Sequence, residues 1–388
     1  MEQSLPNRIH SLDLLKGIII ILMALDHTRD YFHDAILIYD ALDPNKTNIP
    51  VYLSRWITHF CAPGFSLLAG ISAYLIGQRK TKNELATFLL KRGIWLIIIE
   101  MTIITFGWYF DIRFKVIALL VIWALGISMI ALAALIYLPR NWILIFSCIL
   151  IFGHNFLDGV HFEKNFIWTA LHEVGYFKLS ENHYLRVGYP VIPWIGVMSL
   201  GYYFGVFYSK RFTPNKRRKT LNIIGLSSVL LFVVLRCVNY YGNAIHWKEH
   251  DTFAKTMFSF FNTEKYPPSL TFLLMTLGPM FLFLANSENL KGKITRFFST
   301  FGKVPFFFYI IHIYVIHLFA LLFAEISGYG WRQMLMTFTG DTNLDGYGVS
   351  IWIVSIIWIA IVLLLYPLCK KFGFYKQNHK EKWWLSYL

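Results

Sequence analysis

About ten long apolar segments, separated by short connectors that carry most of the charge, constrain this chain more than any other feature of its sequence. Each segment holds roughly 20 residues with few charges, enough for a helix to cross a bilayer core of about 30 Å. The segments run over residues 12–33, 51–78, 87–110, 115–138, 141–157, 188–208, 220–240, 267–286, 301–324 and 349–369. The sequence therefore predicts an all-α, polytopic integral membrane protein of about ten transmembrane helices, in a single domain over residues 1–388.

The composition argues against the soluble alternatives. Of the 388 residues, 56% are hydrophobic and only 15% are charged, so a water-soluble fold would expose large apolar patches. The net charge of +14 does not indicate a nucleic-acid partner, because the basic residues lie in connectors between apolar segments. The four cysteines have no CxxC spacing, and they suggest neither a disulfide framework nor a zinc site.

The distribution of charge predicts the orientation in the membrane. If the N-terminus is cytoplasmic, most of the 36 Lys and Arg fall in cytoplasmic connectors, and most of the 22 Asp and Glu fall outside. This alternation fits an even number of helices with both the N-terminus and the C-terminus in the cytoplasm. The two long outer connectors, 158–187 and 241–266, are expected to be functional or disordered. A homo-oligomer is a further possibility, since Gly201-x3-Gly205 would allow close packing between helices.

Ionisable residues inside the apolar segments are the best predictors of a site. A charge at membrane depth costs about 2.5 to 3.5 kcal/mol on insertion scales, so such residues normally face a cavity or a partner. Lys16 and His27 are eleven residues apart on the first segment, which puts them on roughly the same helix face about 16 Å apart. They could hold a long substrate between them. Alternatively, Lys16 extends to lipid headgroups and His27 lies at the interface.

Other titratable residues lie in the second, third, fifth and ninth segments. His59 is next to a Pro-Gly break, Glu100 lies deep in the third segment, and His312 lies near the membrane midplane. Four histidines could converge in a bundle, either at a metal or in a proton-handling pocket: His27, His59, His154 and His312. No His pair or carboxylate has the local spacing of metal ligands, so a metal is not expected. Structural pairing explains His59 and Glu100 equally well.

Several motifs resemble a known family. The run Arg8-Ile-His-Ser11-Leu12-Asp13-Leu-Leu-Lys16-Gly17 is similar to the opening signature of bacterial relatives of the lysosomal heparan-α-glucosaminide N-acetyltransferase, with Lys16 in place of the usual Arg. Three later stretches match the style of that family, around Pro193-Trp194, around Pro267-Pro268 and from Phe301 to His312. The resemblance runs from the first segment to the terminal Trp383-Trp384. It implies a location in the bacterial cytoplasmic membrane.

The spacing Lys16-x10-His27 also resembles a motif in the first helix of the wider transmembrane acyltransferase superfamily. In that superfamily the histidine is the proposed catalytic residue, and inner basic residues hold the phosphates of CoA. The resemblance implies a donor-binding set of Lys16, Arg92, Lys91, Arg8 and Tyr309. The sugar N-acetyltransferase instead has Asn near the position of His27 and a later catalytic His, which leaves His33 as a rival base.

The resemblance and the spacing together predict an acetyltransferase. Acetyl-CoA would bind from the cytoplasm, and His27 would act as base or acyl carrier for a hydroxyl or amine of an extracytoplasmic sugar or glycan. Asp26 or Asp30 would orient His27, Asp30 being better placed by helix spacing, with His59, His312 and Tyr309 as candidate donors to the thioester oxygen. The alternative is a proton-coupled transporter, but the inverted repeat expected of one is not evident.

Overall fold

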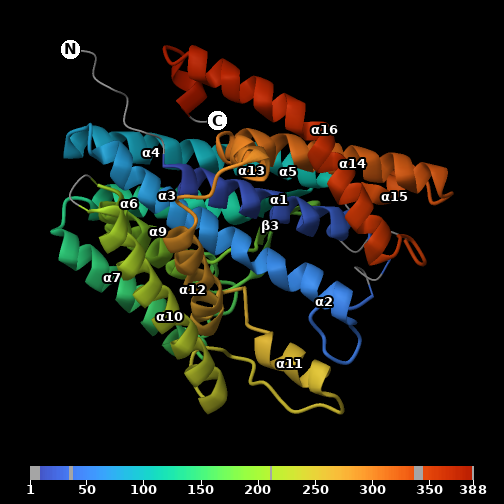
Figure 1. Ribbon diagram of the computed structural model, residues 1–388. Coiled ribbons are helices and arrows are strands. Elements are labelled where there is room, and N and C mark those ends of the chain that lie inside the picture. Colours follow the sequence, from blue (N-terminus) through green and yellow to red (C-terminus); the bar gives the residue numbers. More distant parts are fainter. Residues whose placement is uncertain (1–8, 35–37, 210–211, 336–343, 387–388) are drawn as a thin grey trace.

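The computed structural model describes residues 9–34, 38–209, 212–335 and 344–386, and this part of the chain is predominantly helical (Figure 1). The helices of the first half are α1 (His10–Phe32), α2 (Ile49–Trp56), α3 (Cys61–Gly77), α4 (Lys82–Ile99), α5 (Thr105–Tyr109), α6 (Val121–Leu135), α7 (Arg140–Gly153) and α8 (Phe166–His172). Those of the second half are α9 (Ile192–Phe204), α10 (Pro214–Val238), α11 (Phe253–Phe261), α12 (Leu270–Asn286), α13 (Lys293–Gly302), α14 (Pro305–Ile326), α15 (Trp331–Met334) and α16 (Ile351–Asn378).

Within the described residues, five helices are long and apolar enough to cross a membrane: Ile49–Gly77, Arg140–Leu157, Pro214–Val238, Pro305–Ile326 and Ile351–Asn378. Val121–Leu135 and Leu270–Asn286 are apolar but shorter. Each of the ten expected segments contains at least one helix, but not all bounds agree: α16, for example, ends nine residues beyond the expected segment 349–369. The chain is therefore a helical protein with several helices that can span a membrane.

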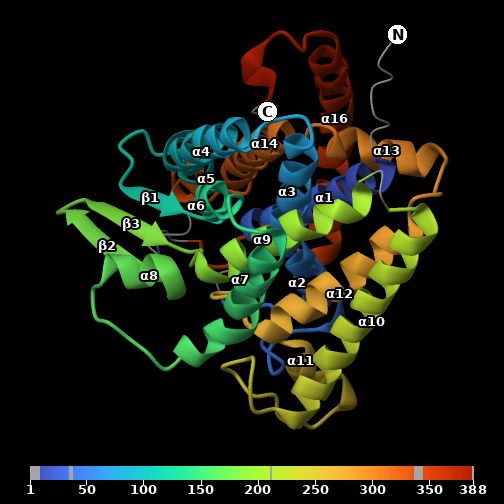
Figure 2. The same cartoon turned by 90° about the vertical axis from the view of Figure 1, so that its left-hand side faces the viewer.

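The prediction of an all-α fold was wrong in one region. Residues 115–138 do not form a single helix, because β1 (Val116–Leu119) precedes α6. Together with β2 (Gly175–Ser180) and β3 (His183–Val187) it forms a sheet of order β1-β3-β2, in which β1 is parallel and β2 antiparallel to β3. A short apolar run such as Val-Ile-Ala-Leu reads equally well as helix or strand, and here its partner lies about 70 residues later. Figure 2 shows the sheet and α8 to one side of the helices.

Two of the expected helices are interrupted next to buried polar residues. The 3-10 turn η1 (Ile57–Phe60) contains His59 and separates α2 from α3. The π-helical turn η2 (Glu100–Ile104) separates α4 from α5 and begins at Glu100. The Glu100 carboxylate accepts a hydrogen bond of 2.9 Å from the backbone N–H of Trp123, so it satisfies one of the unpaired donors at the start of α6. Glu100 therefore has a structural partner at the first turn of α6.

Helix α1 lies at the centre of the packing (Figures 1 and 2). It packs against α3, α13, α14 and α16, and most of its residues are buried. Its contact with α13 is close because both helices have glycine there: a Cβ on Gly302 would lie 1.8 Å from the carbonyl oxygen of Asp13, and one on Gly17 would lie 1.9 Å from that of Phe298. Similarly, Gly201 of α9 packs onto the carbonyl of Leu67 in α3. This glycine therefore allows close packing between two helices of the same chain.

The contact between α1 and α13 gives a test of this packing. We expect Gly302→Ala to lower the unfolding temperature of the purified protein, because its new methyl group would meet backbone that cannot rotate away. Overpacking of this kind typically costs about 1–3 kcal/mol. Gly153→Ala is the matched control, since a Cβ there would meet no atom within 4 Å. Equal unfolding temperatures for the two variants would contradict the close packing.

Candidate functional site

Two cavities lie along α1, and they meet. The first, which we name the Lys16 cavity, has a volume of about 170 Å³ and lies among α1, α3, α4, α6 and α14. The second, the His27 cavity, has a volume of about 850 Å³ and is lined by residues of α1, α2, α5, β2, β3 and the segments before α6, α9 and α12. Val121 and Tyr309 line both cavities. The two cavities are therefore adjacent, with Val121 and Tyr309 at the boundary.

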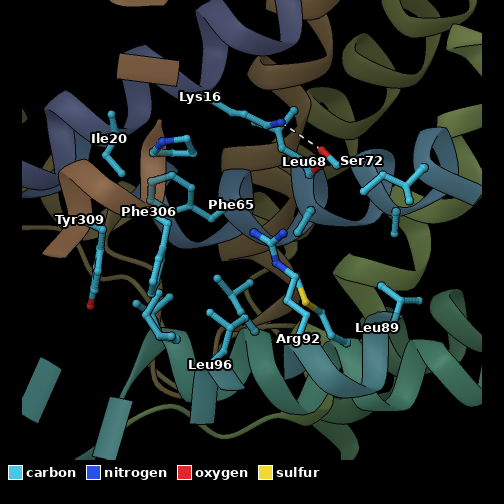
Figure 3. A pocket seen from close by; sticks show the side chains of 18 of the residues that line it. Lys16, Ile20, Phe65, Leu68, Ser72, Leu89, Arg92, Leu96, Phe306 and Tyr309 are labelled. Carbon is cyan, nitrogen blue, oxygen red and sulfur yellow. Dashed lines mark hydrogen bonds between the residues drawn. The ribbon is translucent and has the colours of Figure 1, made fainter. Parts of the chain in front are cut away.

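The walls of the Lys16 cavity are mainly apolar, with cationic side chains at one end. The Lys16 ammonium donates a 3.0 Å hydrogen bond to the Ser72 hydroxyl, and Arg92 extends from α4 toward the same space (Figure 3). The Arg92 guanidinium also lies 6.0 Å from the centre of the Phe88 ring. Tyr309 lies at the other side of the view from Arg92. The cavity thus pairs a positive end with an apolar passage that leads toward Tyr309.

The other two basic residues predicted to bind the donor differ from Lys16 and Arg92 in placement. Lys91 is exposed and belongs to the outward face of α4, together with Leu90, Ile94 and Ile98. Its neighbour Arg92 is half-buried and lines the cavity, because adjacent helical residues point in different directions. Arg8 lies outside the described residues.

His27 lines the second cavity and is only 9% exposed. Its Nδ1 lies 2.8 Å from Nε2 of His312, and the two ring planes are 17° apart with centroids separated by 5.0 Å. The edge of the Trp108 ring packs on His27 with centroids 4.7 Å apart, and Tyr309 lies next to it. The sequence favoured Asp30 as the group that orients His27, whereas in the structure the hydrogen bond goes to His312, from a helix 285 residues later in the chain.

Asp26 and Asp30 belong to an ion-pair cluster in the wall of the same cavity. The Asp26 carboxylate accepts hydrogen bonds from Arg29, from Arg55 at 2.8 and 2.9 Å, and from the Thr58 hydroxyl at 2.9 Å. Lys265 lies 3.9 Å from it. Asp30 pairs with Arg29 at 3.0 Å. The two carboxylates therefore hold cations in place around His27.

Of the four histidines that could converge, only His27 and His312 meet. His59 is fully buried, and its ring packs edge-on against Phe272 at 5.2 Å. Neither ring nitrogen of His59 has a hydrogen-bond partner among the described residues. His154 bonds instead to the carbonyls of Leu150, Ile151 and Pro268.

His33, the rival base, lies at the end of α1 and lines neither cavity. It is buried, its Nε2 is 3.6 Å from Asp34, and its backbone bridges to Val349. The described residues contain no group of three or more His, Cys, Asp or Glu side chains that could hold a metal ion.

Sequence reasoning missed much of the wall of the His27 cavity. Both long connectors contribute to it, through Tyr176 and Arg186 of the first and Lys265 and Tyr266 of the second. The Tyr266 hydroxyl lies 3.4 Å from that of Tyr189. Burial would raise the pKa of Tyr266, but Lys265 and Arg55 lower it below its ordinary value. The length of the connectors pointed to this region, and Lys265 and Tyr266 also adjoin the stretch around Pro267-Pro268 that resembles the family.

The comparison with known families decides what kind of protein this is. Residues 8–237 match the family model described as heparan-alpha-glucosaminide N-acetyltransferase, catalytic. The chain belongs to this acetyltransferase family. A comparison with curated proteins found no match. Members of the family transfer acetyl groups and in general use acetyl-CoA as donor, so the match favours a membrane transferase over a transporter.

The family match covers only part of the site of this acetyltransferase. Lys16, His27 and Arg92 lie inside the matched residues, whereas Tyr309 and His312 lie beyond them. The structure brings the residues inside the match and those beyond it to one site, because α14 packs directly on α1.

The ion pairs around Asp26 are expected to stabilise the folded protein. We expect Asp26→Asn to lower the unfolding temperature strongly, since it leaves Arg29 and Arg55 without their shared counter-charge. Removal of one partner of a buried ion pair typically costs about 3–5 kcal/mol. Asp30→Asn is the matched comparison, because within the described part of the chain Asp30 pairs only with Arg29, and its side chain is 21% exposed. A larger loss for the Asp30 variant would contradict this ranking.

Proposed function

We propose that this protein transfers an acetyl group from cytoplasmic acetyl-CoA to a hydroxyl or amine of a sugar or glycan on the other side of the membrane. The observation that carries the proposal is the junction of two unlike cavities on one helix. One is small and mainly apolar with a positive end, and the other is larger and more polar, with a histidine at its wall. A donor and an acceptor entering from opposite faces would meet near Tyr309, where the cavities adjoin.

The Lys16 cavity suits the donor. Lys16 and Arg92 would pair with phosphate oxygens of CoA through charge-assisted hydrogen bonds, in which Arg can bind two oxygens at once. The apolar walls would hold the pantetheine arm. Lys16 and His27 lie on one unbroken helix and are separated along its axis by about 16 Å, a length comparable to that of the arm. The thioester would then lie beside His27.

The direction of transfer follows from the charge distribution. We propose that the end of α1 near Lys16 faces the cytoplasm, because the connectors on that side hold most of the Lys and Arg. On this assignment the chain crosses the membrane ten times, with both termini cytoplasmic, and the His27 cavity opens to the outside of a bacterial cytoplasmic membrane. The sheet and the segments at 188–189 and 265–266 would then form the outer mouth.

The His27 cavity suits a polar acceptor with a ring. Its wall combines aromatic side chains with hydrogen-bonding groups: Trp108, Tyr109, Tyr176, Tyr189, Tyr266, Arg55, Arg186 and Lys265. Aromatic faces supply contact area for a sugar ring, and the polar groups fix its orientation. His27 would take the proton of the attacking hydroxyl or amine, since a neutral imidazole has a nitrogen that can accept a proton and later return it. In a two-step transfer, a nitrogen of His27 would instead attack the thioester and carry the acetyl group as an acyl-histidine.

We expect His27→Ala to abolish acetyl transfer while the protein remains folded in the membrane. His33→Ala should retain most activity, because His33 lines neither cavity. The measurement uses vesicles that contain the protein, with labelled acetyl-CoA on the cytoplasmic face and a panel of amino sugars and glycans on the other. Retained transfer by folded His27→Ala, or a larger loss in His33→Ala, would refute the assignment. Unmodified acceptor accumulating across the membrane would indicate a transporter.

The donor site can be tested with two neighbours on α4. We expect Arg92→Ala to raise the KM for acetyl-CoA about tenfold or more, as one charge-assisted contact is worth roughly 1.5–3 kcal/mol. Lys91→Ala should leave this KM close to that of the wild type, because Lys91 lies on the exposed face of α4. The ratio of the two KM values is the readout, and a ratio near one would contradict the proposed donor site.

A further inference from the structure

The hydrogen bonds around His312 fix the positions of two protons. His312 Nδ1 lies 2.9 Å from the backbone carbonyl oxygen of Phe308, one turn earlier on α14. A carbonyl oxygen only accepts, so Nδ1 of His312 must carry the proton of this bond. In a neutral imidazole the other nitrogen then has a lone pair and no proton. Nε2 of His312 is therefore an acceptor.

The same reasoning extends to His27. His312 Nε2 lies 2.8 Å from Nδ1 of His27, and because the former accepts, the latter must donate. Nδ1 of His27 therefore carries its proton, and its Nε2 carries the lone pair. Among the described residues, Nε2 of His27 has no recorded hydrogen bond, and His27 lines the second cavity. The basic nitrogen thus belongs to a side chain that lines the space assigned to the acceptor.

We infer that His312 is a positioning residue that selects the reactive tautomer of His27, through a chain that runs from the Phe308 carbonyl through His312 to His27. This role rests on the proposed function of His27 as base. It resembles the part that a carboxylate plays next to a catalytic histidine, which is to hold the imidazole in one tautomer and orientation. Here a neutral imidazole performs that part.

The chain of hydrogen bonds also accounts for the proton during direct transfer. Nε2 of His27 takes the proton as the acceptor oxygen or nitrogen bonds to the thioester carbon. The resulting imidazolium donates through Nδ1 to His312, whose own Nδ1–H remains bonded to the Phe308 carbonyl. When the tetrahedral intermediate collapses, the carbon–sulfur bond breaks, and the proton on Nε2 passes to the departing thiolate. The products are the acetylated acceptor and CoA, and His27 regains its starting tautomer.

The packing keeps this arrangement in place. His312 is fully buried and stacks on Phe308 with ring centroids 5.1 Å apart, while Trp108 packs on the other histidine of the pair. Phe308 is itself fully buried. Since neither ring can rotate without breaking these contacts, the tautomer preference is expected to persist in the absence of substrate.

Two substitutions at position 312 separate the effect of His312 on the tautomer of His27 from its effect on local packing. Gln places its side-chain amide near the position of Nε2, so His312→Gln can still accept from His27. Asn places its amide near the position of Nδ1, so His312→Asn keeps a donor for the Phe308 carbonyl but loses the acceptor for His27. The pair differs by one methylene, and each variant keeps a different one of the two hydrogen bonds of His312, so the effects of the two losses can be compared directly.

The primary measurement is nitrogen NMR of the protein with labelled histidine in lipid nanodiscs, with His27 assigned by its absence from His27→Ala. We expect protonated Nδ1 and unprotonated Nε2 for His27 in the wild type and in His312→Gln, and a mixture of tautomers in His312→Asn. The kcat for acetyl transfer should fall on the order of 10²- to 10⁴-fold in the Asn variant, with an unchanged KM for acetyl-CoA, and much less in the Gln variant.

The outcomes that overturn the inference are specific to it. Protonated Nε2 on wild-type His27 would do so, as would an unchanged tautomer in the Asn variant or equal losses of kcat in both variants. The NMR result needs no turnover. If the expected tautomer is found but His27→Ala remains active, the proposed function of His27 fails while the assignment of the protons stands.

Discussion

The interaction on which the site depends is the sharing of one buried carboxylate among several cations. Asp26 binds Arg29 on its own helix, Arg55 at the end of α2, and Lys265 in the segment before α12. Buried charges are tolerated only where they are paired and hydrogen-bonded. The cluster therefore joins α1 to two distant parts of the chain and keeps cationic side chains at the wall of the His27 cavity.

The second constraint is the close approach of helices at glycine. Gly17 and Gly302 let α13 approach the backbone of α1, and α14 follows α13 after only Lys303 and Val304. The position of α14 against α1 is what brings His312 to His27 and Tyr309 to the boundary between the cavities. A packing feature at one end of α1 thus contributes to the geometry of the chemistry near the other end.

The sequence predicted a predominantly helical membrane protein, and the structure shows where its candidate site residues lie. The spacing of Lys16 and His27 placed them on one helix face, and the structure shows each of them lining a cavity. It did not predict the pairing of His27 with His312, because periodicity describes neighbours within a helix and carries no information on which helices touch. For the same reason, helix spacing favoured Asp30 as the group that orients His27, because spacing relates only residues of the same helix.

The strand β1 was missed for a related cause. Its four apolar residues carry no periodic signal that separates strand from helix, and pairing with β3 decides the matter. Arg55 lies near one end of an apolar segment, where its neighbours in the sequence give no sign of a partner, and the ion pair with Asp26 turns it inward. In each case tertiary contact overrides what the local sequence indicates.

The choice of an imidazole next to His27 follows from the cost of buried charge. A carboxylate at the position of His312 would add a further anion deep in the bundle, and it would need counter-charges of its own beyond those that Asp26 already holds. A neutral histidine whose Nδ1–H is satisfied by the Phe308 carbonyl needs none, so it can orient His27 at a site that is fully buried. Neutrality has a second consequence, because an imidazole stabilises the imidazolium of His27 less than a carboxylate would. His27 therefore gives up its proton more readily to the leaving thiolate, which suits a site where cations already surround the histidine.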